Sequence, residues 1–172
     1  MILVLSKQDV HLARSEAEAL LGPGELFDNL LMVPGTTPKP LAYTREFHQL
    51  LFSSQPKALY HGLAQYPWHQ TIQGTYKVGG PRPCADIIWH QLTSPKVNLT
   101  APDTEIHIMG TDPVFVTRLM KRNTDDFEAR KPQFRPESLP ISLHPKLARC
   151  MVNLTGCRHG TIFDPCCGTG GI

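Results

Sequence analysis

A glycine-rich segment near residue 170 has the residue types of a ligand-binding loop. The apolar run Thr161–Phe163 ends at a carboxylate, Asp164, and the chain continues as PCCGTGG. If this run is a strand of an α/β sheet, the loop follows the carboxyl end of the strand, where such sheets bind ligands. Glycines let the backbone approach a ligand closely, and a following helix would offer free N–H groups. We interpret the segment as a nucleotide-cofactor loop, with an ordinary tight turn as the alternative.

Several cysteines and histidines in the same region are candidate zinc ligands. They are Cys150, Cys157, Cys166, Cys167, His144 and His159. Zinc sites favour C-x2–4-C pairs and about four ligands, whereas successive cysteines here are seven, nine and one positions apart. We therefore expect thiols and no bound metal. The total of five cysteines is odd, which argues against a disulfide framework and favours a reducing compartment.

The positive charge of the chain is unevenly distributed. The net charge is +2, yet residues 57–149 contain twelve basic and eight acidic side chains. Basic residues alternate there with Phe127 and Phe134, which combines cations for phosphates with rings for stacking. The basic cluster is Arg118, Lys121, Arg122, Arg130, Lys131 and Arg135. This pattern predicts contact with a polyanion; the alternative is a solvated linker, partly neutralised by the acids of residues 125–128.

The elements that must position these residues are short. Hydrophobic residues make up 41% of the chain, enough for a core, and the 16 prolines favour many short elements joined by turns. Apolar periodicity predicts helices over residues 9–21, 56–66, 84–93 and 145–154, with a further helical spacing at residues 47–51. It predicts strands over residues 1–5, 25–33, 41–45, 71–78, 96–100, 105–109, 113–119 and 161–164.

These elements form an α+β pattern in which we expect antiparallel pairing. Residues 123–142 have little periodicity and three prolines, which predicts a linker. The helix after it begins with Pro145 and carries an apolar stripe of Leu147, Ala148, Met151 and Leu154. No apolar run reaches the ~18 residues that span a bilayer.

Longer strings resemble a known enzyme family. DPCCGTGG resembles the first S-adenosylmethionine motif of methyltransferases, in the D-P-x-C-G-T-G form of RNA N2-guanine methyltransferases. LHPKLARCMVNLTG resembles the helix that opens their catalytic domain, and KPQFRP followed by ESLPISLHP resembles their linker. TYKVGGPRPCADIIWHQL and KVNLTAPDTEIHI resemble the THUMP domain, an RNA-binding module. The first fifty residues are similar to the ferredoxin-like segment that precedes THUMP in archaeal tRNA guanine-10 N2-methyltransferases.

The resemblance implies four parts. Residues 1–50 would be the ferredoxin-like segment, 51–122 the THUMP domain and 123–142 the linker. Residues 143–172 would be the first helix and strand of a doubly wound α/β (Rossmann-like) methyltransferase domain, truncated after its first cofactor motif. The fold class is thus α+β followed by the beginning of an α/β domain.

The implied function is the N-terminal part of a cytoplasmic, S-adenosylmethionine-dependent tRNA guanine-N2 methyltransferase, whose THUMP module binds tRNA. A small partner subunit is possible, as in the eukaryotic counterpart. The residues that match the cofactor motif are Asp164, Gly168, Thr169 and Gly170. The expected RNA-binding residues are Arg82, Arg118, Lys121, Arg122, Arg130 and Lys131.

No catalytic residue is assigned, because the family's N/D-P-P-Y motif does not occur in these 172 residues. We therefore expect no methyl transfer by this chain alone. Two alternatives remain: a stand-alone RNA-binding module, and a methyltransferase acting on ribosomal RNA or another tRNA position.

Overall fold

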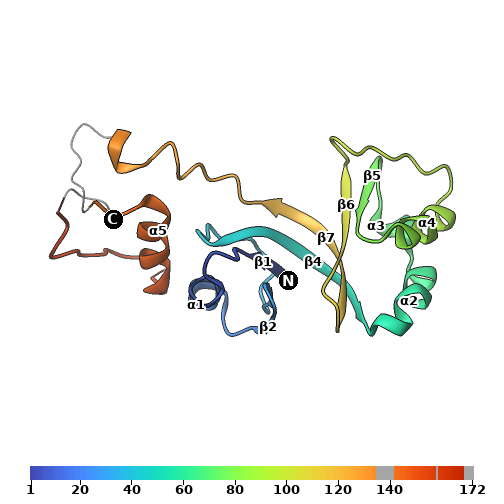
Figure 1. The fold of residues 1–172 in the computed structure, drawn as a ribbon, viewed down its shortest axis with the longest axis horizontal. Helices are drawn as coiled ribbons and strands as arrows, with labels where there is room; N and C mark the ends of the chain where they lie inside the picture. Colours follow the sequence, from blue (N-terminus) through green and yellow to red (C-terminus); the bar gives the residue numbers. More distant parts are fainter. Residues whose placement is uncertain (135–141, 158, 169–172) are drawn as a thin grey trace. The chain divides into compact units, whose positions relative to one another are not determined.

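A computed structural model describes residues 1–134, 142–157 and 159–168 of the protein (Figure 1). Its strands are β1 (Ile2–Leu5), β2 (Glu25–Phe27), β3 (Leu30–Met32), β4 (Thr44–Ser54), β5 (Tyr76–Gly79), β6 (Thr104–Met109) and β7 (Val114–Arg122). Its α-helices are α1 (Val10–Leu21), α2 (Leu59–Gln65), α3 (Trp68–Thr71), α4 (Arg82–Gln91) and α5 (Pro145–Leu154). Short 3-10 turns are η1 (Pro56–Ala58) and η2 (Pro132–Phe134).

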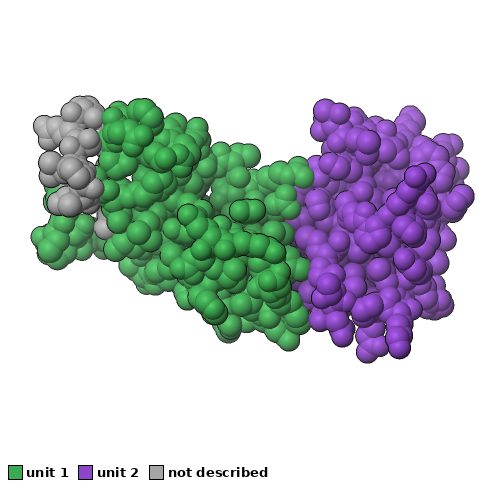
Figure 2. Space-filling model, viewed as in Figure 1, with its two compact units in different colours: residues 1, 3–47, 121–172 green, residues 2, 48–120 purple. Residues whose placement is uncertain are grey.

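The described strands pair in the order β2-β3-β1-β4-β7-β6-β5. The described chain divides into two compact units, which Figure 2 shows in green and purple. Unit 1 comprises residues 1, 3–47 and 121–172, and unit 2 comprises residues 2 and 48–120. The mixed α+β class expected from the sequence is confirmed. None of the described helices combines the length and the hydropathy that a membrane-spanning helix needs.

Unit 1 has a core built from β1, β3 and one face of α1. Leu3, Leu31, Phe47 and Ala17 are fully or almost fully buried in it. Helix α1 begins where the Asp9 side chain accepts the Leu12 N–H at 2.9 Å and ends at Gly22. Gly22 has φ +90°, a conformation that glycine adopts without a steric penalty.

One strand prediction and one helix prediction in the first half of the chain are wrong. Residues 25–33 form a hairpin rather than one strand, because the chain reverses between Phe27 and Leu30 with Asp28 at φ +53°. The helical spacing at residues 47–51 lies instead inside the long strand β4. Neighbouring strand side chains point to opposite faces, and both Phe47 and His48 are buried, so both faces of the strand are covered here and buried positions do not alternate with exposed ones.

Unit 2 contains a parallel strand pair that was not predicted from the sequence. Strand β5 pairs parallel with β6, whereas β6 pairs antiparallel with β7. Helix α4 lies in the connection from β5 to β6, as a parallel pair requires a crossover. The expectation of purely antiparallel pairing is therefore wrong. The predicted strand at residues 96–100 is reduced to one isolated bridge between Val97 and Tyr76.

The predicted strand at residues 161–164 is also absent: these residues have no regular secondary structure. Phe163 is 83% exposed and Ile162 is 44% exposed. A parallel strand is normally covered on both faces, and the described residues supply no paired neighbour for this segment. The helix before it, α5, forms as predicted, with Pro145 in its first turn and Gly156 just beyond its end.

The core of unit 2 is centred on Trp68, which is 1% exposed and donates its indole N–H to the Leu63 carbonyl at 2.8 Å. We expect Trp68→Ala to lower the free energy of unfolding by about 3–5 kcal/mol, because it removes a large buried ring and leaves a cavity. Urea denaturation followed by circular dichroism measures the change. Trp89→Ala is the matched control, since Trp89 is 44% exposed. Equal losses for both variants would contradict this account of the core.

Candidate functional site

The candidate cofactor loop is partly described. The Asp164 side chain accepts the backbone N–H of Cys166 at 2.9 Å, which closes a tight turn. Gly168 has φ +52°, the left-handed conformation that favours glycine. The other two predicted cofactor residues, Thr169 and Gly170, lie outside the described residues.

This turn fits one edge of a cofactor site. Asp164 is half-buried and has a second carboxylate oxygen that could accept an ammonium group. A Cβ atom built on Gly168 would find its nearest neighbour 3.9 Å away, at the Cys166 carbonyl, so the backbone is open to approach. The loop does not follow a strand, however, because the predicted strand before it is absent. Its expected place at the carboxyl end of a sheet strand is therefore wrong for the described residues.

The predicted RNA-binding residues differ in how they are paired. Arg118 donates to the Gln49 side chain at 2.8 Å, and Arg122 forms a 3.2 Å ion pair with Glu46. Lys131 forms an ion pair with Glu128. These three side chains are partly engaged by the protein itself.

Three predicted RNA-binding residues have no ion pair within the described chain: Arg82, Lys121 and Arg130. The Arg130 guanidinium lies 4.9 Å from the Phe127 ring centroid, and its Nε donates to the Asp126 carbonyl at 3.3 Å. Lys121, near the end of β7, and Arg82, at the start of α4, are exposed. Among the predicted RNA-binding residues, these two are the most available to a polyanion.

The structure groups four of these cations in one unit. Lys121, Arg122, Arg130 and Lys131 belong to unit 1, whereas Arg82 and Arg118 belong to unit 2. They lie in two stretches of this unit: Lys121 and Arg122 at the end of β7, and Arg130 and Lys131 in the segment that follows it.

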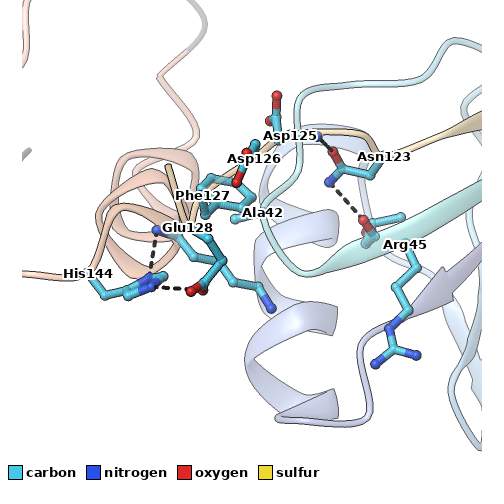
Figure 3. A pocket seen from close by; sticks show the side chains of 10 residues that line it. Ala42, Arg45, Asn123, Asp125, Asp126, Phe127, Glu128 and His144 are labelled. Carbon is cyan, nitrogen blue, oxygen red and sulfur yellow. Dashed lines mark hydrogen bonds and ion pairs between the residues drawn. The ribbon is translucent and has the colours of Figure 1, made fainter. Parts of the chain in front are cut away.

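The segment predicted to be a linker is anchored in its first part. The Asn123 side chain donates to the carbonyls of Leu41 at 2.7 Å and Thr44 at 2.9 Å. Figure 3 shows Asn123 among the side chains that line a pocket. Phe127 is buried in the core of unit 1. Residues 123–128 and the start of α5 border a pocket of about 290 Å³ in this unit. Its lining residues are Ala42, Thr44, Arg45, Asn123, Asp125, Asp126, Phe127, Glu128, His144 and Lys146.

The acids of this pocket already have partners. Asp125 lies 3.7 Å from the Arg149 guanidinium, and Asp126 accepts the Ala129 N–H at 3.0 Å. Glu128 contacts His144 at 3.6 Å in addition to its ion pair with a lysine (Figure 3). Hydrogen bonds and charge from these partners lower the pKa of Glu128.

Two basic residues that line the pocket, Arg45 and Lys146, were not predicted from the sequence as site residues. Arg45 is exposed and has no ion pair with a described residue. The Lys146 ammonium lies 4.3 Å from the Tyr43 ring centroid and donates to Gln8 at 3.1 Å. Burial, and then the nearby charge of Arg45, lower the pKa of Lys146. No sequence pattern marks Arg45 and Lys146 as a pair, because they lie 101 positions apart in the sequence.

The cysteines fall into two environments. Cys84 and Cys150 are buried, and Cys157, Cys166 and Cys167 are exposed. Burial, with a contribution from the charge of Glu16, raises the pKa of the Cys150 thiol to about 12. In the described part of the chain, no group of three or more His, Cys, Asp or Glu residues is placed to hold a metal ion.

Comparisons with known proteins point to one enzyme class. A family described as an RMKL-like methyltransferase domain matches residues 132–172. The tRNA (guanine(10)-N2)-dimethyltransferase of Methanothermobacter thermautotrophicus is 33% identical over 148 residues, which cover 78% of this chain and 44% of the relative. The enzyme of the same name from Methanocaldococcus jannaschii is 40% identical over 83 residues, covering 46% of this chain and 24% of the relative.

A solved structure shares the fold. The crystal structure of TrmN from Thermus thermophilus matches with a TM-score of 0.58 at 17% identity, covering 89% of this chain and 53% of that chain. The chain thus spans less than half the length of the curated relatives it matches. The family resemblance expected from the sequence motifs is confirmed by these matches.

The two cysteine environments predict two rates of thiol modification. Iodoacetamide should alkylate Cys157, Cys166 and Cys167 at least tenfold faster than Cys84 and Cys150, because reaction needs an accessible thiolate. Peptide mass spectrometry after timed quenching at pH 8 measures the five rates, and the urea-unfolded chain is the control in which they should converge. A fast Cys150 in the native chain would contradict its burial.

Proposed function

We propose that this chain, a relative of the tRNA guanine-N2 methyltransferases, is the tRNA-recognising part of an S-adenosylmethionine-dependent enzyme that methylates a guanine amino group in tRNA. The observation that carries the proposal is the 33% identity to a tRNA (guanine(10)-N2)-dimethyltransferase over 148 residues. An alignment of this length includes most of the chain, not only the glycine-rich motif. The same relative makes guanine 10 the proposed target nucleotide.

The domain assignment from the sequence remains part of the proposal. Residues 1–50 would be the ferredoxin-like segment and residues 51–122 the THUMP domain that binds tRNA. Residues 123–142 would connect them to the methyltransferase domain that begins at residue 143. The overall similarity to the fold of TrmN supports this arrangement.

The cofactor would be held by the glycine-rich loop. Asp164 would accept the ammonium group of S-adenosylmethionine, and Gly168, Thr169 and Gly170 would let the backbone lie against it. When bound, the cofactor supplies the methyl group. The carboxylate-closed turn and the open face of Gly168 support this assignment.

The RNA surface of unit 1 would include Lys121, Arg122, Arg130 and Lys131, with Arg82 and Arg118 contributing from unit 2. Cations that contact phosphate release counterions from the nucleic acid, so their effect depends on salt. Lys121 supports the proposal most directly, because it is exposed and has no ion pair with the described residues. We place the protein in the cytoplasm, where its tRNA substrate is. The family resemblance also implies a small partner subunit, as in the eukaryotic counterpart.

We expect this chain to bind tRNA with an affinity that falls by orders of magnitude between about 50 and 200 mM salt, if several phosphates are contacted. Replacing Lys121, Arg122, Arg130 and Lys131 together with glutamine should weaken binding and flatten the salt dependence. The single variant Lys121→Gln should reduce the slope by about 1. Fluorescence anisotropy with labelled tRNA, at a series of salt concentrations, measures both quantities.

The matched control for Lys121→Gln is Lys7→Gln, which removes the same charge from a lysine paired with Asp28 at 3.4 Å. It should leave the slope unchanged. Binding that is independent of salt, or unchanged in the fourfold variant, would place the RNA surface elsewhere, with Lys77, Arg82 and Lys96 as the next residues to replace.

We also expect no methyl transfer by the 172-residue chain, since the family's N/D-P-P-Y motif is not among its residues. The chain is incubated with radiolabelled S-adenosylmethionine and unmodified tRNA, and acid-precipitable label is counted. A reaction without protein sets the background. Incorporation above that background would show that residues outside the known motif perform the reaction.

A further inference from the structure

Helix α5 lies in the segment that matches the methyltransferase family, yet it packs within unit 1, beside α1 (Figure 1). The contact between the two helices includes a buried carboxylate, Glu16, which is 0% exposed. Glu16 Oε1 accepts the Asn153 side-chain N–H at 2.6 Å. Asn153 is itself buried and also donates to the Pro40 carbonyl at 3.0 Å.

The remaining bonds of Glu16 come from the backbone. Its Oε1 also accepts the Ala42 N–H at 2.7 Å, and its Oε2 accepts the Tyr43 N–H at 2.9 Å. A buried charge without donors is strongly destabilising, whereas one with several hydrogen bonds is tolerated. Three segments that are distant in sequence are thus joined at one carboxylate: α1, residues 40–43 and α5.

The face of α5 that meets unit 1 is not its most apolar face. Ala148, Cys150 and Asn153 are buried, whereas Met151 is 43% exposed and Leu154 is 39% exposed. The apolar stripe read from the sequence predicted the opposite orientation for Met151 and Leu154. Hydrophobic burial alone would therefore rotate the helix differently, and the Glu16–Asn153 bond favours the observed rotation.

We propose that Glu16 is a positioning residue that holds α5 on unit 1 through Asn153. Helix α5, which lies in the segment that matches the methyltransferase family, is then held in place by unit 1. Its orientation does not depend on the catalytic residues of the enzyme. The inference that Glu16 anchors α5 depends only on contacts within unit 1. Its consequence for the orientation of the methyltransferase domain rests on the proposed function.

The test measures release of α5 from unit 1 in this same chain. Asn153→Leu keeps the size of the side chain but removes the donor, and Asn153→Asp places a second carboxylate against Glu16. Both variants should raise the alkylation rate of Cys150 at least tenfold, because Cys150 lies on the face of α5 that is buried against unit 1. Hydrogen exchange of α5 should accelerate in parallel, while exchange of α4 in unit 2 stays unchanged.

A swap separates this specific bond from general packing. In the Glu16→Gln/Asn153→Asp double variant, the new amide can donate to the new carboxylate while its oxygen accepts one backbone N–H. Its Cys150 rate should therefore lie closer to the unmodified chain than that of Asn153→Asp alone, which is the signature of a direct pairwise interaction. Met151→Ala, on the exposed side of the same helix, should leave the rate unchanged.

Three results would overturn the proposal. One is a Cys150 rate in the unmodified chain as high as that of Cys157. The second is an unchanged rate in Asn153→Leu. The third is a loss of exchange protection throughout both units in both Asn153 variants, which would give Asn153 a role in overall folding rather than in docking. Failure of tRNA binding would contradict the proposed function but leave these outcomes unaffected.

Discussion

A carboxylate that is removed from water must accept hydrogen bonds from nearby N–H or O–H groups. In unit 1, Glu16 is such a buried carboxylate. Its oxygens take one side-chain and two backbone N–H groups, from Asn153, Ala42 and Tyr43. Each donor is costly to lose, because the charge would stay buried without compensation. The path of residues 40–43 and the rotation of α5 are therefore constrained together. Burial and then the Glu16 charge raise the pKa of Cys150. The same charge opposes the lowering of the pKa of Lys146 by burial and Arg45.

Features set by local chemistry could be predicted from the sequence. The predicted helices over residues 9–21 and 145–154 form where expected. Their ends depend on contacts within a few residues: the Asp9 cap and Gly22 for α1, and Pro145 in the first turn of α5. Strand predictions failed where the outcome depended on distant partners. The apolar residues of β4 are spaced as in a helix because side chains on both faces of that strand are buried or half-buried. The segment at residues 161–164 has strand-like residues but no neighbouring strand in the described chain.

The candidate site shows the same division. The basic residues are visible in the sequence, but their availability is not, since Arg118 and Arg122 meet Gln49 and Glu46 across 69 and 76 residues. The burial of Glu16 could not be predicted for the same reason. Nothing in the sequence of α1, VHLARSEAEALL, distinguishes Glu16 from a solvent-exposed acid. Asn153 occurs in a family-like string, yet its role depends on a partner 137 residues away.

The structure of the glycine-rich loop depends partly on contacts between neighbouring residues and partly on partners distant in the sequence. Its turn is closed by Asp164 and Cys166, two residues apart, so the local geometry forms without a sheet. Burial of Ile162 and Phe163 requires partners on both faces, which local geometry cannot supply. A cofactor site needs both, because a carboxylate binds an ammonium group more strongly where water is excluded. Helix α5 ends ten residues before Asp164, so the donor requirement of Glu16 acts on the helix that precedes the loop, whereas the loop itself depends on its own local turn.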